Sequence, residues 1–83
     1  MRLLYFAWLR EKAGTGEETV TPPDTVKTVA DLLDWQEARG GGHAEAFADR
    51  KVVRVAVNQE YVSLNHPVAV GDEIAFFPPV TGG

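Results

Sequence analysis

The sequence predicts one small α+β domain, built as a mixed β-sheet with one main helix packed across it. Its length of 83 residues suits a single domain. Apolar or alternating segments near both ends predict strands, and one amphipathic segment between them predicts the helix. A hydrophobic content of 45% supplies enough side chains for a packed core. Each segment is considered below in chain order.

The chain opens with two predicted strands. Residues 2–9 (RLLYFAWL) are apolar at nearly every position, which predicts a central strand covered on both faces. Residues 12–18 (KAGTGEE) contain two glycines, which favours a hairpin turn. Residues 17–22 (EETVTP) then predict a short second strand, which Pro22 and Pro23 terminate.

The middle of the chain predicts the main helix. It begins at Thr28, and Asp31 three residues later resembles a capping box with Asp in place of Glu. Val29, Leu32, Leu33 and Gln36 follow along one stripe of the helix. Residues 40–42 are all glycine, which predicts a left-handed end and a flexible turn. Residues 44–49 can add one helical turn, anchored by Phe47.

Three strands complete the prediction. Residues 51–64 read as a strand, a turn at Asn58-Gln59 and a short return strand, because Val53, Val55 and Val57 alternate with other residues. A loop with a turn at Gly71-Asp72 leads to the last strand, residues 73–77 (EIAFF). The first and last strands are the most apolar, so we expect both to be central and adjacent. This arrangement is the β-grasp, or ubiquitin-like, fold.

Composition excludes several kinds of function. The chain has no cysteine, so it offers no disulfide, thiol nucleophile or cysteine metal site. Its formal net charge of −4 argues against nucleic acid as the main partner, and no apolar run approaches the roughly 20 residues of a membrane span. We therefore expect a cytoplasmic protein without a membrane or nucleic-acid partner.

The polar residues show no catalytic pattern. His43 and His66 are predicted to lie in different loops, and no Asp or Glu stands at metal-ligand spacing beside either of them. Asp72 and Glu73 are adjacent, so their side chains point apart in a turn. The glycine-rich stretches lack the context of a phosphate loop. The sequence therefore predicts a scaffold with no metal site, no bound cofactor and no catalytic site of its own.

The last strand predicts an exposed apolar patch. If Ile74 and Phe76 enter the core, Phe77 points to the opposite side, where Phe6 and Tyr61 can join it. Such a patch is typical of a docking surface. The alternative is that Phe77 is tucked against the opposite face of the sheet.

The C-terminal residues predict a separate extended tail. Pro78 and Pro79 end the last strand and favour an extended exit, which divides the chain into a domain of residues 1–77 and a tail of residues 78–83. Glycine has no Cβ and can pass through a narrow channel, so Gly82-Gly83 suits delivery of a terminal carboxylate to another protein's active site.

These residues resemble a known family. The stretches AVNQEYVSLNHPVAVGDEIAFFPPVTGG and YFAWLREKAG resemble the small, sulfur-carrier subunits of molybdopterin synthase. The resemblance implies that an E1-like adenylyltransferase, related to the ubiquitin-activating enzyme, uses ATP to adenylate the terminal carboxylate. A sulfur donor then displaces AMP and leaves a thiocarboxylate. The large catalytic subunit receives the tail, and sulfur passes to cyclic pyranopterin monophosphate in molybdenum cofactor biosynthesis. The family assembles as a heterotetramer.

The resemblance also implies roles for particular residues. Gly83 carries the reactive acyl group, and Gly82 gives passage and flexibility. The remaining tail residues that enter the partner are Val80 and Thr81, preceded by Pro78 and Pro79 at the partner surface. The apolar docking patch is formed by Phe6, Tyr61 and Phe77, with Arg10 as a polar contact beside it. The chain is then a sulfur-donor subunit, and its partner supplies the catalytic groups.

Three other functions remain open from the sequence. A sulfur carrier for thiamin thiazole synthesis shares the fold and the Gly-Gly chemistry. A ubiquitin-like modifier would join Gly83 to lysine side chains through an isopeptide bond. An interaction module with an inert tail would need neither sulfur transfer nor isopeptide bond formation.

Overall fold

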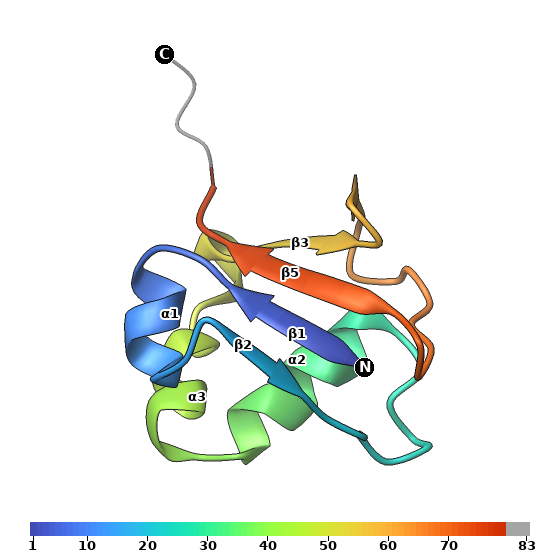
Figure 1. Cartoon of the computed structure of the whole chain (residues 1–83), viewed down its shortest axis with the longest axis horizontal. Helices are drawn as coiled ribbons and strands as arrows, with labels where there is room; N and C mark the ends of the chain where they lie inside the picture. The colour runs from blue at the N-terminus through green and yellow to red at the C-terminus, as the bar shows by residue number, and fades with distance from the viewer. Residues whose placement is uncertain (80–83) are drawn as a thin grey trace.

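The computed structural model describes residues 1–79 and shows a five-stranded mixed sheet with helices on one side (Figure 1). None of the helices in these residues is long and apolar enough to cross a membrane. In chain order the elements are β1 (Arg2–Tyr5), α1 (Trp8–Ala13), β2 (Glu17–Thr19), α2 (Val29–Ala38), α3 (Gly41–Ala46), the 3-10 turn η1 (Arg50–Val52), β3 (Arg54–Val57), β4 (Glu60–Tyr61) and β5 (Glu73–Phe77).

The sheet has the strand order β2-β1-β5-β3-β4, which confirms the β-grasp prediction. The first and last strands are central and adjacent, as expected. They run parallel, with Leu3 opposite Ile74 and Tyr5 opposite Phe76. β3 pairs antiparallel with the other side of β5. The C-terminal end of β5 therefore lies between β1 and β3.

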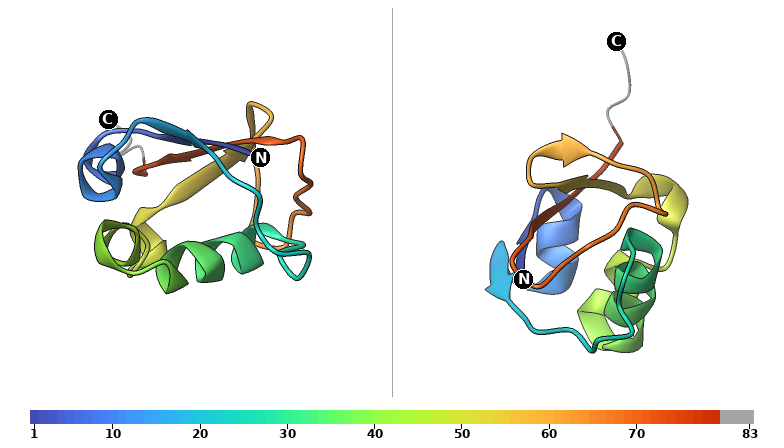
Figure 2. Two further views of the ribbon diagram at one scale, coloured as in Figure 1. Left: turned by 60° about the horizontal axis from the view of Figure 1, so that its bottom comes forward. Right: turned by 90° about the vertical axis from the view of Figure 1, so that its right-hand side faces the viewer.

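The core lies between the sheet and the helices. α2 and α3 cover one face of the sheet, and the other face is open (Figure 2). The sheet contributes fully buried side chains such as Leu3, Ile74 and Phe76, and the helical layer contributes Leu32 and Phe47. Burial of this apolar surface is the main favourable term in folding. Phe47 is thus confirmed as an anchor.

The expectation that β1 is covered on both faces is wrong. Its inward side chains Leu3 and Tyr5 are buried, whereas Arg2 is exposed and Leu4 is only half-buried. The apolar residues at the start of the chain lie on two different faces of the sheet. One set of side chains fills the core, and the other set lines an open face.

The first two strands pair antiparallel, but the connection predicted as a simple hairpin turn at residues 12–18 is wrong, because helix α1 lies between β1 and β2. The strand ends at Tyr5, and Ala7 adopts φ 54° and ψ −134° to turn the chain into the helix. Within α1, Leu9 is buried and Ala13 is half-buried on one stripe. Gly14 ends the helix with φ 80°, a left-handed cap that glycine adopts without steric cost.

α2 forms where its pattern predicts. The Asp31 N–H donates to Thr28 Oγ1 at 3.2 Å, and the Thr28 N–H donates to Asp31 Oδ2 at 3.1 Å. This reciprocal pair is the predicted capping box. Gly40 follows the helix with φ 78°, as expected, but Gly41 and Gly42 begin helix α3 and are not a flexible turn.

The turn between β3 and β4 is confirmed. Asn58 and Gln59 both have positive φ, at 49° and 70°, which matches the twist of a tight hairpin. The return strand β4 has only two residues, with Tyr61 opposite Ala56. The Val62 N–H, just after β4, still donates to the Val55 carbonyl at 3.2 Å, so only the start of β3 lies at the edge of the sheet.

Candidate docking site

An apolar patch formed by Phe6, Tyr61 and Phe77 lies on the open face of the sheet. Tyr61 is 80% exposed and Phe6 is 49% exposed, while Phe77 is half-buried. The Tyr61 and Phe77 ring centroids are 5.3 Å apart. Phe6 continues β1 beside the end of β5, since its N–H donates to the Phe76 carbonyl at 3.1 Å. The structure thus brings together three aromatic residues that are distant in the sequence.

The alternation of β5 places these side chains. Ile74 and Phe76 are fully buried, as predicted, and Phe77 points to the opposite, open face. The alternative in which Phe77 is tucked against the opposite sheet face is met in part, because Phe77 is half-buried there. Phe77 is less exposed than expected, because the Tyr61 ring packs on it.

A hollow of about 210 Å³ adjoins the patch. Its lining residues are Arg54, Val55, Tyr61, Val62 and Phe77. Arg54 is opposite Phe77 in the β3–β5 register and is exposed. The sequence analysis did not select Arg54. Its alternation with Val53 and Val55 does place it on the outer face, but the pairing with Phe77 requires the register of the two strands.

Arg10 lies on the opposite flank of the patch. It is exposed on α1, four residues after Phe6, and its side chain extends over Gly16 just before β2. A Cβ placed on Gly16 would be 3.1 Å from Arg10 Nε. Given the strand order, Arg10 lies on the β2 side of the patch and Arg54 on the β3 side.

Pro78 and Pro79 follow β5 directly and are half-buried. They continue the chain from the end of the strand that carries Phe77 (Figure 1). The predicted tail residues Val80, Thr81, Gly82 and Gly83 lie outside the described residues.

The histidines occupy structural positions. His43 lies in α3 rather than in a loop, and its Nε2 is 3.0 Å from Glu18 Oε2. His66 Nδ1 lies 2.8 Å from the Pro67 carbonyl oxygen. Among residues 1–79, no group of three or more His, Asp or Glu side chains is placed to hold a metal ion.

A polar cluster around Glu18, here called the Glu18 network, lies at the side of the core. Glu18 accepts hydrogen bonds from Tyr5 Oη at 2.5 Å and from both Arg39 Nη atoms at 2.9 Å. Gln36 Nε2 donates to Tyr5 Oη at 2.7 Å. These bonds, led by those from Arg39, lower the pKa of Glu18 from 4.5 to about 2. Burial and the carboxylate beside it raise the pKa of the Tyr5 hydroxyl. The network joins β1, β2, α2 and α3, which is a structural role.

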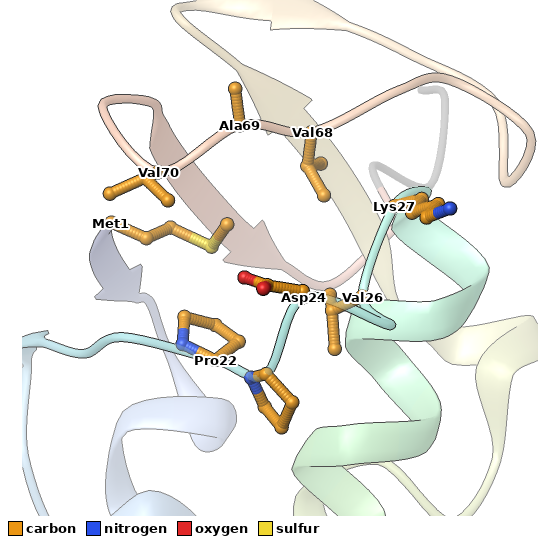
Figure 3. Close-up of a pocket in the computed structure, with 9 residues that line it drawn as sticks. Met1, Pro22, Asp24, Val26, Lys27, Val68, Ala69 and Val70 are labelled. Atoms are coloured by element: carbon orange, nitrogen blue, oxygen red, sulfur yellow. The ribbon is translucent and has the colours of Figure 1, made fainter.

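A second hollow lies at the opposite end of the sheet (Figure 3). It has a volume of about 290 Å³ and lies between Met1, the loop around Pro22–Lys27 and the segment Val68–Val70. Its charged lining side chains are Asp24 and Lys27. It borders the N-terminal ends of β1 and β5, so the chain leaves β5 at the other end.

The fold is that of a ubiquitin-like β-grasp protein, and an apolar patch lies at the end of its last strand. The chain belongs to the ThiS family, whose model matches residues 3–83. It is 43% identical over 83 residues to the molybdopterin synthase sulfur carrier subunit of Escherichia coli K12, covering 100% of this chain and 99% of that protein. The same comparison with the human sulfur carrier subunit gives 39% identity over 88 residues, covering 100% and 93% of the two chains.

The similarity reaches other ubiquitin-like proteins. The chain is 38% identical to small archaeal modifier protein 1 of Haloferax volcanii over 86 residues, covering 94% of each. Among solved structures, a putative molybdopterin converting factor subunit 1 from Pyrococcus furiosus has a TM-score of 0.78 and 33% identity, covering 95% of both chains. The predicted resemblance to molybdopterin synthase sulfur carriers is confirmed.

Proposed function

We propose that this protein carries sulfur as a thiocarboxylate on Gly83 and donates it within molybdopterin synthase. The similarity to curated sulfur carrier subunits, which spans the whole chain including Gly82-Gly83, is the observation that supports this function most directly. The apolar patch beside the exit of β5 adds a surface on which a partner could bind close to the tail.

The proposed chemistry has two activation steps. A Gly83 carboxylate oxygen attacks the α-phosphorus of ATP on the E1-like adenylyltransferase, which releases pyrophosphate and forms an acyl adenylate. A donor of sulfide-level sulfur (hydrosulfide or its equivalent) then attacks the Gly83 carbonyl carbon. The bond to the AMP oxygen breaks, AMP leaves and the S–H proton passes to solvent, because phosphate is a better leaving group than oxide. The product is a thiocarboxylate. ATP is consumed by the activating enzyme and is not held by this chain.

Sulfur transfer follows in the complex with the large catalytic subunit. Phe6, Tyr61 and Phe77 bind the partner surface, and Pro78 and Pro79 direct the tail away from the sheet. Val80 and Thr81 form part of the inserted tail, and Gly82 lets the tail pass through a narrow channel. The thiocarboxylate sulfur bonds to cyclic pyranopterin monophosphate. Water then attacks the Gly83 carbonyl carbon and the C–S bond breaks, which leaves the sulfur on the pterin and restores the Gly83 carboxylate. We expect two carriers and two large subunits in the assembly.

A second candidate is a protein modifier that joins Gly83 to lysine side chains. The identity of 38% with small archaeal modifier protein 1 favours it. Both functions begin with the acyl adenylate. They differ in what happens to the acyl group next. In the carrier a sulfur donor displaces AMP, whereas in the modifier the acyl group is passed to a lysine amine.

Intact mass measurement separates the candidates. The purified chain is incubated with ATP, its cognate activating enzyme and a sulfur donor. Replacement of one oxygen by sulfur at Gly83 is the result expected for the carrier. An unchanged mass, with the activating enzyme shown to be competent on another carrier, contradicts it. Conjugates to lysine in place of the thiocarboxylate would support the modifier.

Deletion of Gly83 should abolish the mass change and leave the fold intact. A terminal Gly-Gly buries little surface, so we expect the thermal midpoint to stay within about 2 °C, less than 1 kcal/mol of unfolding free energy. A loss of stability comparable to that of a core substitution would contradict this prediction.

A further inference from the structure

Arg54 is the charged residue nearest the start of the tail in the strand register. It lies opposite Phe77, the last residue of β5. It is exposed and lines the hollow together with Tyr61 and Phe77. Its side chain therefore borders the apolar patch on the β3 side, with the guanidinium close to the backbone carbonyls of Lys51 and Val53.

Arg54 differs from most other arginines in the chain. Arg2, Arg39 and Arg50 each form an ion pair with a carboxylate. Within residues 1–79, Arg54 forms no such pair, and its Nη1 donates only to the backbone carbonyls of Lys51 and Val53, at 3.2 and 3.3 Å. The nearby Glu60 alternates with Tyr61 along β4, so its side chain points away from the patch.

Arg10 has the same property on the other flank. No ion pair joins it to a carboxylate within the described part of the chain. The molecule as a whole carries a net charge of −4. On the β3 side, Arg54 lies near the exposed Lys51, so this flank of the apolar patch is locally positive, the reverse of the overall charge. On the β2 side, Glu11 lies beside Arg10 and offsets its charge.

We propose that Arg54 is a specificity-determining residue that binds a carboxylate on the large subunit. Beside this carboxylate, an apolar side chain of the large subunit enters the hollow. This inference rests on the proposed function. An arginine fork matches a carboxylate in geometry. Arg54 is exposed at the rim of the hollow, so the pair forms where salt can screen it. The partner surface is thus acidic on the side that faces Arg54, next to an apolar centre. Global charge alone would suggest a basic partner surface.

The test is calorimetric titration of the full-length chain, in its carboxylate form, into the cognate large subunit. This measurement requires no sulfur chemistry. Arg54→Ala should weaken binding about 10-fold, as expected for loss of one close charge pair. Arg54→Lys keeps the charge and should lose about 3-fold or less, because it cannot form the bidentate contact.

Arg2→Ala is the matched control. It removes the same charge from the opposite end of the same open face, where Arg2 is opposite Glu73. An exposed ion pair is worth little, so binding should change by less than about 2-fold. Raising the ionic strength from about 0.1 M to 1 M shortens the Debye length from about 10 to 3 Å and should reduce the difference between wild type and Arg54→Ala.

The outcomes are distinguishable. If the wild type binds and Arg54→Ala binds equally well, or loses no more than Arg2→Ala, the role of Arg54 is wrong and the proposed function stands. A loss that does not depend on salt also overturns it, because it would indicate a packing effect. If the wild type does not bind the large subunit, both the proposed function and the role of Arg54 are wrong. Equal thermal midpoints show that each variant is folded.

Discussion

Ala7 has a backbone conformation that L-amino acids rarely adopt. Its φ of 54° and ψ of −134° lie in a region that favours glycine, and it separates Phe6 of the apolar patch from helix α1. Such residues cost about 1–3 kcal/mol and often occur near functional sites. At this position the conformation ends β1 and directs the next six residues into a helix.

Ala7→Gly should therefore raise the free energy of unfolding by about 1 kcal/mol, since the relief of strain exceeds the entropy cost of glycine. Urea unfolding measures the change. The control is Ala44→Gly in α3, where the backbone is helical and glycine should cost about 1 kcal/mol. Destabilisation of equal size in both variants would show that Ala7 is not strained.

Phe77 should matter more for binding than for folding. Its ring is half-buried on the open face against Tyr61, and it does not reach the core. Phe77→Ala should weaken binding to the large subunit by about 10-fold or more, with a stability loss of about 1 kcal/mol. Phe76→Ala, at a fully buried position, should cost about 3–5 kcal/mol. An unfolded Phe77→Ala variant would place this residue in the core instead.

At the scale of elements, the contact between α1 and α3 depends on Gly42. A Cβ at this position would lie 1.8 Å from the Lys12 carbonyl oxygen, which is backbone and cannot rotate away. Gly42→Ala should therefore lower the free energy of unfolding by about 2 kcal/mol as the helices separate. Gly71→Ala is the matched control, because a Cβ there meets no atom within 4 Å. Equal denaturant midpoints for the two variants would contradict this contact.

At the scale of the whole molecule, the Glu18 network connects four elements and makes stability depend on pH. The pKa of Glu18 is about 2 in the folded protein, compared with 4.5 ordinarily. Since the folded pKa is lower, its contribution is complete above about pH 4.5 and disappears as pH falls toward 2. Arg39, Tyr5 and His43 are the groups that face it.

Glu18→Gln should remove a pH-dependent contribution on the order of 2 kcal/mol, so that its unfolding free energy falls less steeply than that of the wild type between about pH 5 and 2. Thermal unfolding over this range measures the slope. The control is Glu17→Gln, at an exposed position paired with Arg2. The Glu18 network has no such role if the unfolding free energies of both variants fall as steeply with decreasing pH as that of the wild type.

Local patterns predicted much of the fold and part of the candidate site. The capping box of Thr28 and Asp31 and the alternation of β5 depend on residues within a few positions of one another, so they can be read directly. The apolar character of β1 and β5 placed them at the centre of the sheet. The inward Phe76 and outward Phe77 followed from the same alternation.

By itself, the sequence determined the β-grasp fold, the main helix and the aromatic residues of the apolar patch. The tertiary structure decided that residues 8–13 are helical and that the helical turn predicted at residues 44–49 lies instead at 41–46, because such short segments gain their stability from packing on each other. It also decided the partners of Glu18 and the position of Arg54 beside Phe77. These contacts join residues far apart in the chain, and strand register sets them only when the sheet has formed.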